Sequence, residues 1–175
     1  MEAHRTHADY SNFELTLKVD TLQSVIESYG ALSSQTRNWV ANLANASSLL
    51  WHAYQLLNIP INWAGFYVVD PKQDDQLILG PFQGKVACQM IKFGKGVCGT
   101  AAARKETQLV DDVTKFPGHI ACDGETKSEI VIPIVVNDKT VGVLDIDCLV
   151  SEGFDIQDEE MLETLARVIA SSSDW

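Results

Sequence analysis

The residues of this chain best suited to chemistry are its four cysteines, Cys88, Cys98, Cys122 and Cys148. Cys122 lies in the stretch HIACDGETKSE, where acidic residues follow it closely before the apolar run IVIPIVV. The cysteines form no C-x-x-C pair, the short-range spacing typical of zinc sites, so we expect no metal site. Structural disulfides are disfavoured in a reducing cytosol. The thiols are therefore either packing residues or reactive groups.

Three acidic residues are predicted to gather near Cys122. In VGVLDIDCLV, strand alternation places Asp145 and Asp147 on one face and Cys148 on the other, where we expect a buried, unreactive thiol. Glu129 begins the preceding strand, and a hairpin would bring it beside the aspartates. Carboxylates this close raise one another's pKa, so one can donate a proton near neutral pH or hold an ammonium group. A solvated sheet face is an equally good interpretation.

Four further residues each allow two interpretations. Cys98 follows the glycine loop FGKG at the start of a predicted helix, where the helix dipole would stabilise a thiolate, or it packs beneath the loop. Cys88 is expected on a strand beside that loop, and reaches the other cysteines only if the fold joins them. His119 could serve as a base for Cys122 or lie on the surface. Trp63, in INWAGFYVV, is either a core aromatic or the apolar wall of a pocket.

The elements that must position these residues differ in hydrophobic period. Amphipathic patterns predict helices at both ends, and short segments rich in aromatic and β-branched residues predict strands between them. The predicted helices are 20–30, 33–57 and 154–172, and 93–105 is predicted to be a glycine loop that enters a short helix. The predicted strands are 61–69, 76–82, 85–91, 107–113, 128–136 and 140–149. This order predicts an α+β fold in which the N- and C-terminal helices pack on one face of a central antiparallel sheet. We expect one domain at 19–175 after a flexible tail at 1–18.

Composition argues against several classes of partner. The net charge of −11 at pH 7 disfavours nucleic acid and anionic membrane surfaces, since both require a basic face. The apolar runs fall short of the roughly 20 residues of a membrane-spanning helix, and the first residues lack the apolar core of a signal peptide. We therefore expect no membrane association. We expect a cytoplasmic location, and presence in the nucleus is compatible with the same observations.

Four segments together closely resemble the free methionine-(R)-sulfoxide reductases, a family built on the GAF domain. They are NWAGFY, LGPFQGKVACQMIKFGKGVCGTAA, HIACDGETKSEIVIPI and VGVLDID. The resemblance extends from about Trp39 to the last helix, and Cys88, Cys98 and Cys122 keep the spacing of that family. It implies a single GAF domain and an enzyme that reduces the R epimer of free methionine sulfoxide.

The resemblance also implies thiol chemistry without a bound cofactor. A thiolate attacks the sulfoxide sulfur, methionine leaves, and the resulting sulfenic acid condenses with a second cysteine to a disulfide. Thioredoxin, itself supplied with electrons from NADPH by thioredoxin reductase, then restores the thiols. The family pattern favours Cys122 as nucleophile, with Cys88 or Cys98 resolving it and a Cys88–Cys122 disulfide as the oxidised form. The helix-dipole argument favours Cys98 as nucleophile instead.

Substrate binding in such a reductase would fall to the acidic residues and one aromatic residue. Glu129, Asp145 and Asp147 would hold the substrate ammonium and supply the proton that the sulfoxide oxygen requires, and Trp63 would pack against the methyl group. Two other functions are left open: a non-catalytic GAF sensor of a small ligand, and a thiol redox sensor. The terminal helices could pair two chains as a homodimer, and packing on their own sheet accounts for them equally well.

Overall fold

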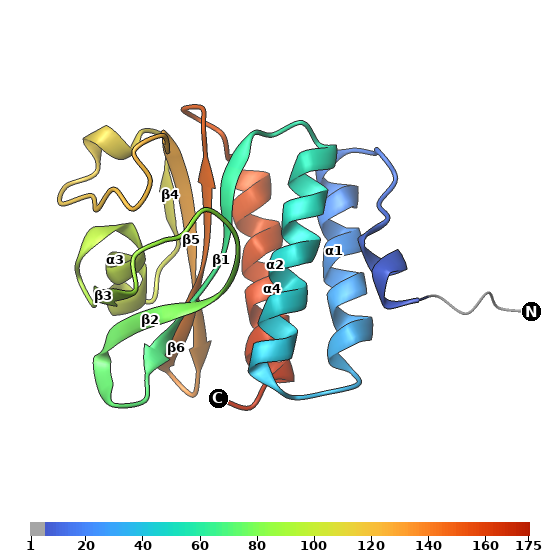
Figure 1. Ribbon diagram of the computed structural model, residues 1–175, viewed down its shortest axis with the longest axis horizontal. Helices are drawn as coiled ribbons and strands as arrows, with labels where there is room; N and C mark the ends of the chain where they lie inside the picture. The colour runs from blue at the N-terminus through green and yellow to red at the C-terminus, as the bar shows by residue number, and fades with distance from the viewer. Residues whose placement is uncertain (1–5) are drawn as a thin grey trace, which may run out of the picture.

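A six-stranded antiparallel sheet forms the centre of the molecule in the computed structural model, which describes residues 6–175 (Figure 1). The strand order is β3-β2-β1-β6-β5-β4. The strands are β1 (Ile61–Asp70), β2 (Gln73–Gly84), β3 (Met90–Lys92), β4 (Gln108–Val110), β5 (Ser128–Val136) and β6 (Lys139–Cys148). The helices are η1 (His7–Ser11), α1 (Lys18–Ser33), α2 (Trp39–Leu56), α3 (Gly96–Arg104), η2 (Val113–Lys115) and α4 (Ile156–Ser172). The predicted α+β class is confirmed.

The three long helices lie on one face of the sheet, in two layers (Figure 1). α2 packs against β1 and β2, α4 packs against β5, and α1 packs on α2 and α4. Their apolar stripes bury side chains such as Leu22, Leu43 and Leu165 in one core with Phe66 and Ile146 of the sheet. The prediction that the N- and C-terminal helices share one face is confirmed.

The β5–β6 hairpin sets the register on which the site depends. Asn137 and Asp138 at its turn have φ values of 49° and 61°, the left-handed conformation that two-residue hairpin turns require and that Asn and Asp tolerate. The resulting register pairs Glu129 with Asp147. The predicted placement of Glu129 beside the aspartates is therefore confirmed.

The opposite face of the sheet is covered by α3 and by the loops around it (Figure 1). A second apolar core, which includes Trp63, Tyr67 and Val97, fills the space between α3 and the sheet. Gly99 allows α3 to approach the end of β3, because a Cβ at this position would collide with the carbonyl oxygen of Lys92. The aspartates on this face are covered, so the interpretation as a solvated sheet face does not hold.

The predicted tail at 1–18 ends where α1 begins, at Lys18. Within it, residues 7–11 form η1, and Tyr10 and Phe13 pack against the helical core. This part of the tail is therefore attached to the domain, whereas residues 1–5 lie outside the described residues. Across residues 6–175, none of the helices has both the length and the apolar character that crossing a membrane requires.

Candidate active site

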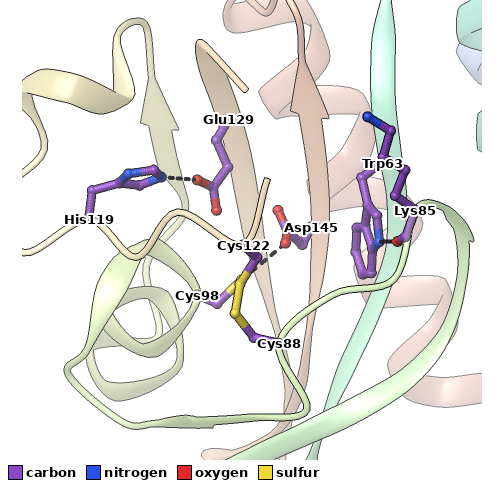
Figure 2. Close-up of a disulfide and its surroundings, with 8 residues drawn as sticks. All are labelled: Trp63, Lys85, Cys88, Cys98, His119, Cys122, Glu129 and Asp145. Atoms are coloured by element: carbon purple, nitrogen blue, oxygen red, sulfur yellow. Dashed lines mark hydrogen bonds and ion pairs between the residues drawn. A yellow bond between two sulfur atoms is a disulfide. The ribbon is translucent and has the colours of Figure 1, made fainter. Parts of the chain in front are cut away.

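A small cavity lies on the face of the sheet that α3 covers, and all the predicted site residues except Cys88 line it. The cavity is bounded by β1, β3, β5, β6, the start of α3, the loop that carries Cys122 and the loop at 85–87 (Figure 2). Its volume is about 40 Å³, which is enough for about three water molecules. Residues that lie far apart in the sequence therefore meet at one point.

Glu129, Asp145 and Asp147 reach this cavity from the adjacent strands β5 and β6. Glu129 and Asp145 are buried, and Asp147 is half-buried. Burial raises the pKa of all three carboxyl groups. A neighbouring acid raises each pKa further. Asp147 raises the pKa of Glu129, Glu129 raises that of Asp145, and Asp145 raises that of Asp147. These acids retain protons at a pH where exposed carboxyl groups have lost them, so they can serve as proton donors.

Cys98 lies in the first turn of α3, as predicted, but its surroundings disfavour a thiolate. Its side chain is 4% exposed, and its Sγ donates a hydrogen bond to Oδ2 of Asp145 at 3.3 Å (Figure 2). Burial raises the pKa of the Cys98 thiol well above its usual value, and the charges of Asp145 and Glu129 raise it further. The predicted stabilisation of a thiolate by the helix dipole is wrong here, because desolvation and two acids outweigh the dipole.

Cys88 and Cys122 are joined by a disulfide, with their Cα atoms 5.6 Å apart (Figure 2). The disulfide that the resemblance implies is therefore present. The expected strand around Cys88 is wrong, because β3 pairs with β2 only from Met90 to Lys92 and leaves Cys88 in the preceding loop. Cys122 is exposed and Cys88 half-buried, so the bond is open to solvent on one side.

His119 and Trp63 take different positions around the cavity. Nε2 of His119 lies 3.6 Å from Oε2 of Glu129, and burial lowers the pKa of this imidazole (Figure 2). His119 is therefore directed at the acidic cluster and is not a surface residue. The indole of Trp63 stacks on Phe82 and Tyr67 with ring centroids 5.2 and 5.7 Å away, so Trp63 is both a core aromatic and a wall of the cavity.

Cys148 lies on the helical face of β6, where it is fully buried in the main core. Its Sγ donates a long hydrogen bond to the carbonyl oxygen of Pro60 at 3.5 Å. The alternation of the strand separates it from Asp145 and Asp147, as predicted. Cys148 is thus remote from the cavity, in agreement with its interpretation as a packing residue.

Several residues that the sequence did not single out fix the loops carrying the disulfide. Asn62 Nδ2 donates to Oδ2 of Asp123 at 3.1 Å and to Oγ1 of Thr126 at 3.0 Å, which holds the Cys122 loop on β1. Trp63 Nε1 donates to the carbonyl oxygen of Lys85 at 3.1 Å. Lys85 also forms an ion pair with Glu125, which joins the loop of Cys88 to the loop of Cys122. The only sequence signal was a polar Asn62 within an apolar strand.

This architecture defines a class of protein. The family model described as GAF domain matches residues 44–172, which is most of the chain, so the chain belongs to the GAF domain family. GAF domains differ in function, and the chemistry of the cavity must distinguish among them.

The comparisons with individual proteins are more specific. The free methionine-R-sulfoxide reductase of Saccharomyces cerevisiae is 64% identical over 168 residues, which cover 95% of this chain and 93% of that protein. The enzyme of the same name from Escherichia coli is 50% identical over 137 residues, covering 78% and 79% of the two chains. An X-ray structure of free methionine-R-sulfoxide reductase from Neisseria meningitidis in complex with its substrate has a TM-score of 0.85 and 38% identity, covering 91% and 92%. Within the GAF fold, the chain therefore belongs to the free methionine-R-sulfoxide reductase family.

Proposed function

We propose that this chain reduces free L-methionine-(R)-sulfoxide to L-methionine, with Cys122 as the nucleophile and Cys88 as the resolving thiol. The observation that carries the proposal is the Cys88–Cys122 disulfide beside a cavity lined by three acids and Trp63. Membership of the reductase family supports the reaction. The pairing supports Cys122 and Cys88 as the two cysteines that exchange during turnover.

The acidic cluster suits a free amino acid. A buried ammonium requires a negatively charged partner, and Oδ1 of Asp145 has no hydrogen-bond partner within residues 6–175. Glu129 and Asp147 would complete the surroundings of the ammonium, whose positive charge favours the ionised form of the carboxyl groups that it contacts. Leaving one member of a buried ion pair without its partner costs about 3–5 kcal/mol. A methionine within a polypeptide has no ammonium at this position, so it would bind at least about a hundredfold more weakly.

Trp63 suits the methylthio end of the substrate. Stacking on Phe82 and Tyr67 and the hydrogen bond to Lys85 fix its indole plane along the cavity. An apolar ring held in this way can contact a methyl group without reorganising. The distance between the acids and Trp63 across the cavity would then select the length of the side chain.

The proposed reaction moves oxygen from the substrate to Cys122. The Cys122 thiolate attacks the sulfoxide sulfur, the oxygen takes a proton from the acidic cluster, and the hydroxyl passes to Cys122 as methionine leaves. Cys122 loses two electrons and becomes a sulfenic acid, while the substrate sulfur gains two. Cys88 then attacks the sulfenic sulfur, the disulfide forms, and the hydroxyl leaves with the Cys88 proton as water.

Cys98 is proposed to act as part of the proton donor. Its raised pKa and its hydrogen bond to Asp145 support a protonated thiol next to a carboxyl group, which is the opposite of what a nucleophile requires. A proton shared by Cys98 and Asp145 would be available to the departing oxygen. This assignment leaves Cys122, which is exposed, as the attacking thiol.

Thioredoxin is the proposed reductant of the disulfide, with NADPH and thioredoxin reductase as the source of electrons. The exposure of Cys122 supports attack by a thiolate of another protein. A cytoplasmic location fits this reductant. We also propose a homodimer, for which the exposed apolar side chains of Leu15, Leu17 and Ile156 offer a surface.

The function is tested by mixing the protein with thioredoxin, thioredoxin reductase, NADPH and each epimer of free methionine sulfoxide. NADPH oxidation and stoichiometric methionine release with the R epimer alone are expected. Binding without NADPH oxidation would indicate a sensor. Disulfide formation with peroxide but no methionine release would indicate a redox sensor. Either of these two outcomes contradicts the proposed reductase.

A further inference from the structure

Three buried side chains in the cavity form a donor set of the kind that binds metal ions. The Sγ of Cys98 and one carboxylate oxygen each of Glu129 and Asp145 all lie within 4.8 Å of one another. They come from α3, β5 and β6, and all three side chains are buried. A thiolate combined with carboxylates suits Zn²⁺ better than hard cations such as Mg²⁺ or Ca²⁺.

The spacing of two of the donors suits a tetrahedral ion. Bonds of about 2.0–2.3 Å to a central Zn²⁺ hold its donors roughly 3.3–3.8 Å apart. The Sγ of Cys98 and Oδ2 of Asp145 are 3.3 Å apart, so an ion can replace the thiol proton that now lies between them. Nε2 of His119 lies 3.6 Å from Oε2 of Glu129, so His119 can orient this carboxylate as an outer-shell partner (Figure 2). The cavity of about 40 Å³ has room for the ion and a water molecule.

Asp145 provides an independent indication of a cationic ligand. The residue is only 6% exposed, and its carboxylate lines the cavity. Its Oδ1 has no hydrogen-bond partner within the described part of the chain. A buried carboxylate oxygen without a partner is destabilising, and a cation in the cavity would satisfy it.

We propose that the cavity is an inhibitory Zn²⁺ site with the ligands Cys98, Glu129 and Asp145. Binding of the ion itself does not depend on the proposed function. The inhibition rests on it, because Zn²⁺ would occupy the carboxylates that are proposed to hold the substrate ammonium. Zn²⁺ and methionine sulfoxide would then exclude each other, and free zinc would lower the turnover of the reductase.

The binding experiment uses the oxidised full-length protein, in which the Cys88–Cys122 disulfide removes both sulfurs as ligands. Co²⁺ serves as a spectroscopic substitute for Zn²⁺, since thiolate-bound Co²⁺ has a charge-transfer absorption in the near ultraviolet. We expect one Co²⁺ per chain with this absorption, and displacement of Co²⁺ by Zn²⁺. Absence of the absorption at saturating Co²⁺ would overturn the proposal.

Matched variants assign the ligands. Cys98→Ser is expected to abolish the charge-transfer absorption, whereas Cys148→Ser, which removes the other free thiol, leaves it unchanged. His119→Ala removes the outer-shell partner of Glu129 and is expected to weaken Zn²⁺ binding by roughly 10–100-fold, and His52→Ala is its control. Asp145→Asn tests the same site with the shape of the side chain retained, should Cys98→Ser not fold. An absorption that survives in Cys98→Ser would contradict the assignment.

The inhibition is measured separately, with thioredoxin as the only reductant because small dithiols chelate zinc. Zn²⁺ is expected to raise the KM for methionine-(R)-sulfoxide and to leave kcat unchanged. Inhibition that lowers kcat alone would show that the ion binds elsewhere on the enzyme. If the protein has no reductase activity, the Co²⁺ experiment still decides whether the site exists, so the two proposals fail independently.

Discussion

The Sγ of Cys98 donates a hydrogen bond to Oδ2 of Asp145 across 3.3 Å in the buried part of the cavity. A thiol that donates to a carboxylate has kept its proton, and the acids beside it hold its pKa well above the usual range. The pair therefore stores a proton next to the place where the sulfoxide oxygen is proposed to lie. The same contact distinguishes Cys98 chemically from Cys122, although both line the cavity.

Single cysteine substitutions are expected to separate these roles. Cys122→Ser should lower kcat by about 10³-fold or more, because it removes the attacking sulfur. Cys88→Ser should retain one rapid turnover, with one methionine per chain and a sulfenic acid at Cys122, and then stop. Rapid-quench measurement of methionine and trapping of the sulfenic acid check both outcomes. Trapping the sulfenic acid at Cys98 instead would contradict the assignment.

Glu129→Gln tests the role of the acidic cluster in binding. The amide keeps the shape of the side chain but cannot carry the charge that pairs with the ammonium. We expect kcat/KM for free methionine-(R)-sulfoxide to fall by about 10–100-fold, mostly through KM. Glu27→Gln, on the exposed side of α1, is the control and should retain full activity. An unchanged KM in Glu129→Gln would exclude Glu129 from the ammonium site.

The same substitution should stabilise the protein, in a manner that depends on pH. The pKa of Glu129 is raised in the fold, so the folded state binds its proton more tightly than the unfolded chain, where the pKa is about 4.3. The free energy of unfolding therefore falls as the pH rises above about 4.3, until the folded-state pKa is passed. In Glu129→Gln the free energy of unfolding does not fall in this way, because the amide does not titrate. Each kcal/mol gained corresponds to roughly 2–4 °C in Tm at this chain length.

Calorimetry or thermal circular dichroism of both proteins between pH 4 and pH 8 checks this expectation. The Tm of Glu129→Gln should match that of the unsubstituted protein near pH 4 and exceed it increasingly toward neutral pH. A Tm difference that is constant over this range would show that titration of Glu129 does not contribute.

The sequence predicted the acidic cluster because its geometry is local. Strand alternation fixes the face of Asp145 and Asp147, and a two-residue turn at Asn137 and Asp138 fixes Glu129 beside them. These relationships involve neighbouring residues along a hairpin, so hydrophobic pattern and turn chemistry are sufficient to predict them.

Long-range packing determines the features that the sequence did not predict correctly. The pKa of Cys98 depends on how deeply α3 packs on the sheet, which the helix N-terminus alone does not indicate. The composition of KVACQMI predicts a strand at Cys88, but an edge strand extends only as far as its neighbour pairs with it. Asn62 was missed because its partner Asp123 lies 61 residues away in the sequence.

Asn62→Ala tests whether the loop that carries Cys122 must be held in place. The substitution removes two side-chain hydrogen bonds, each of which stabilises the loop by about 0.5–1.5 kcal/mol. We expect disulfide formation between Cys88 and Cys122 to slow by roughly 5–100-fold, with little change in KM. Stopped-flow measurement of this step is the readout, and Asn45→Ala, on the exposed side of α2, is the control. A purely structural effect would lower Tm and leave the rate of disulfide formation unchanged.

The oxidised protein is expected to exclude its substrate. With the Cys88–Cys122 disulfide in place, the cavity of about 40 Å³ holds about three water molecules, a volume smaller than that of methionine sulfoxide. The loops of Cys88 and Cys122 are joined by the disulfide and by the Lys85–Glu125 ion pair, so reduction removes their covalent link. Reduction should therefore allow the loops to separate and admit the ligand.

Isothermal titration calorimetry of Cys122→Ser and of the oxidised unsubstituted protein measures this difference. Cys122→Ser cannot form the disulfide or turn over the substrate, and it should bind methionine-(R)-sulfoxide at least about a hundredfold more tightly than the oxidised protein, a difference of about 2.7 kcal/mol. Reducing the unsubstituted protein should restore its affinity for methionine, the product, which does not reoxidise the thiols. Equal affinities in the oxidised and reduced forms would mean that substrate enters without opening these loops. In that case thioredoxin would have to compete with bound ligand. If the affinities differ as expected, only the reduced enzyme takes up sulfoxide, and each turnover must end with the disulfide opened by its reductant.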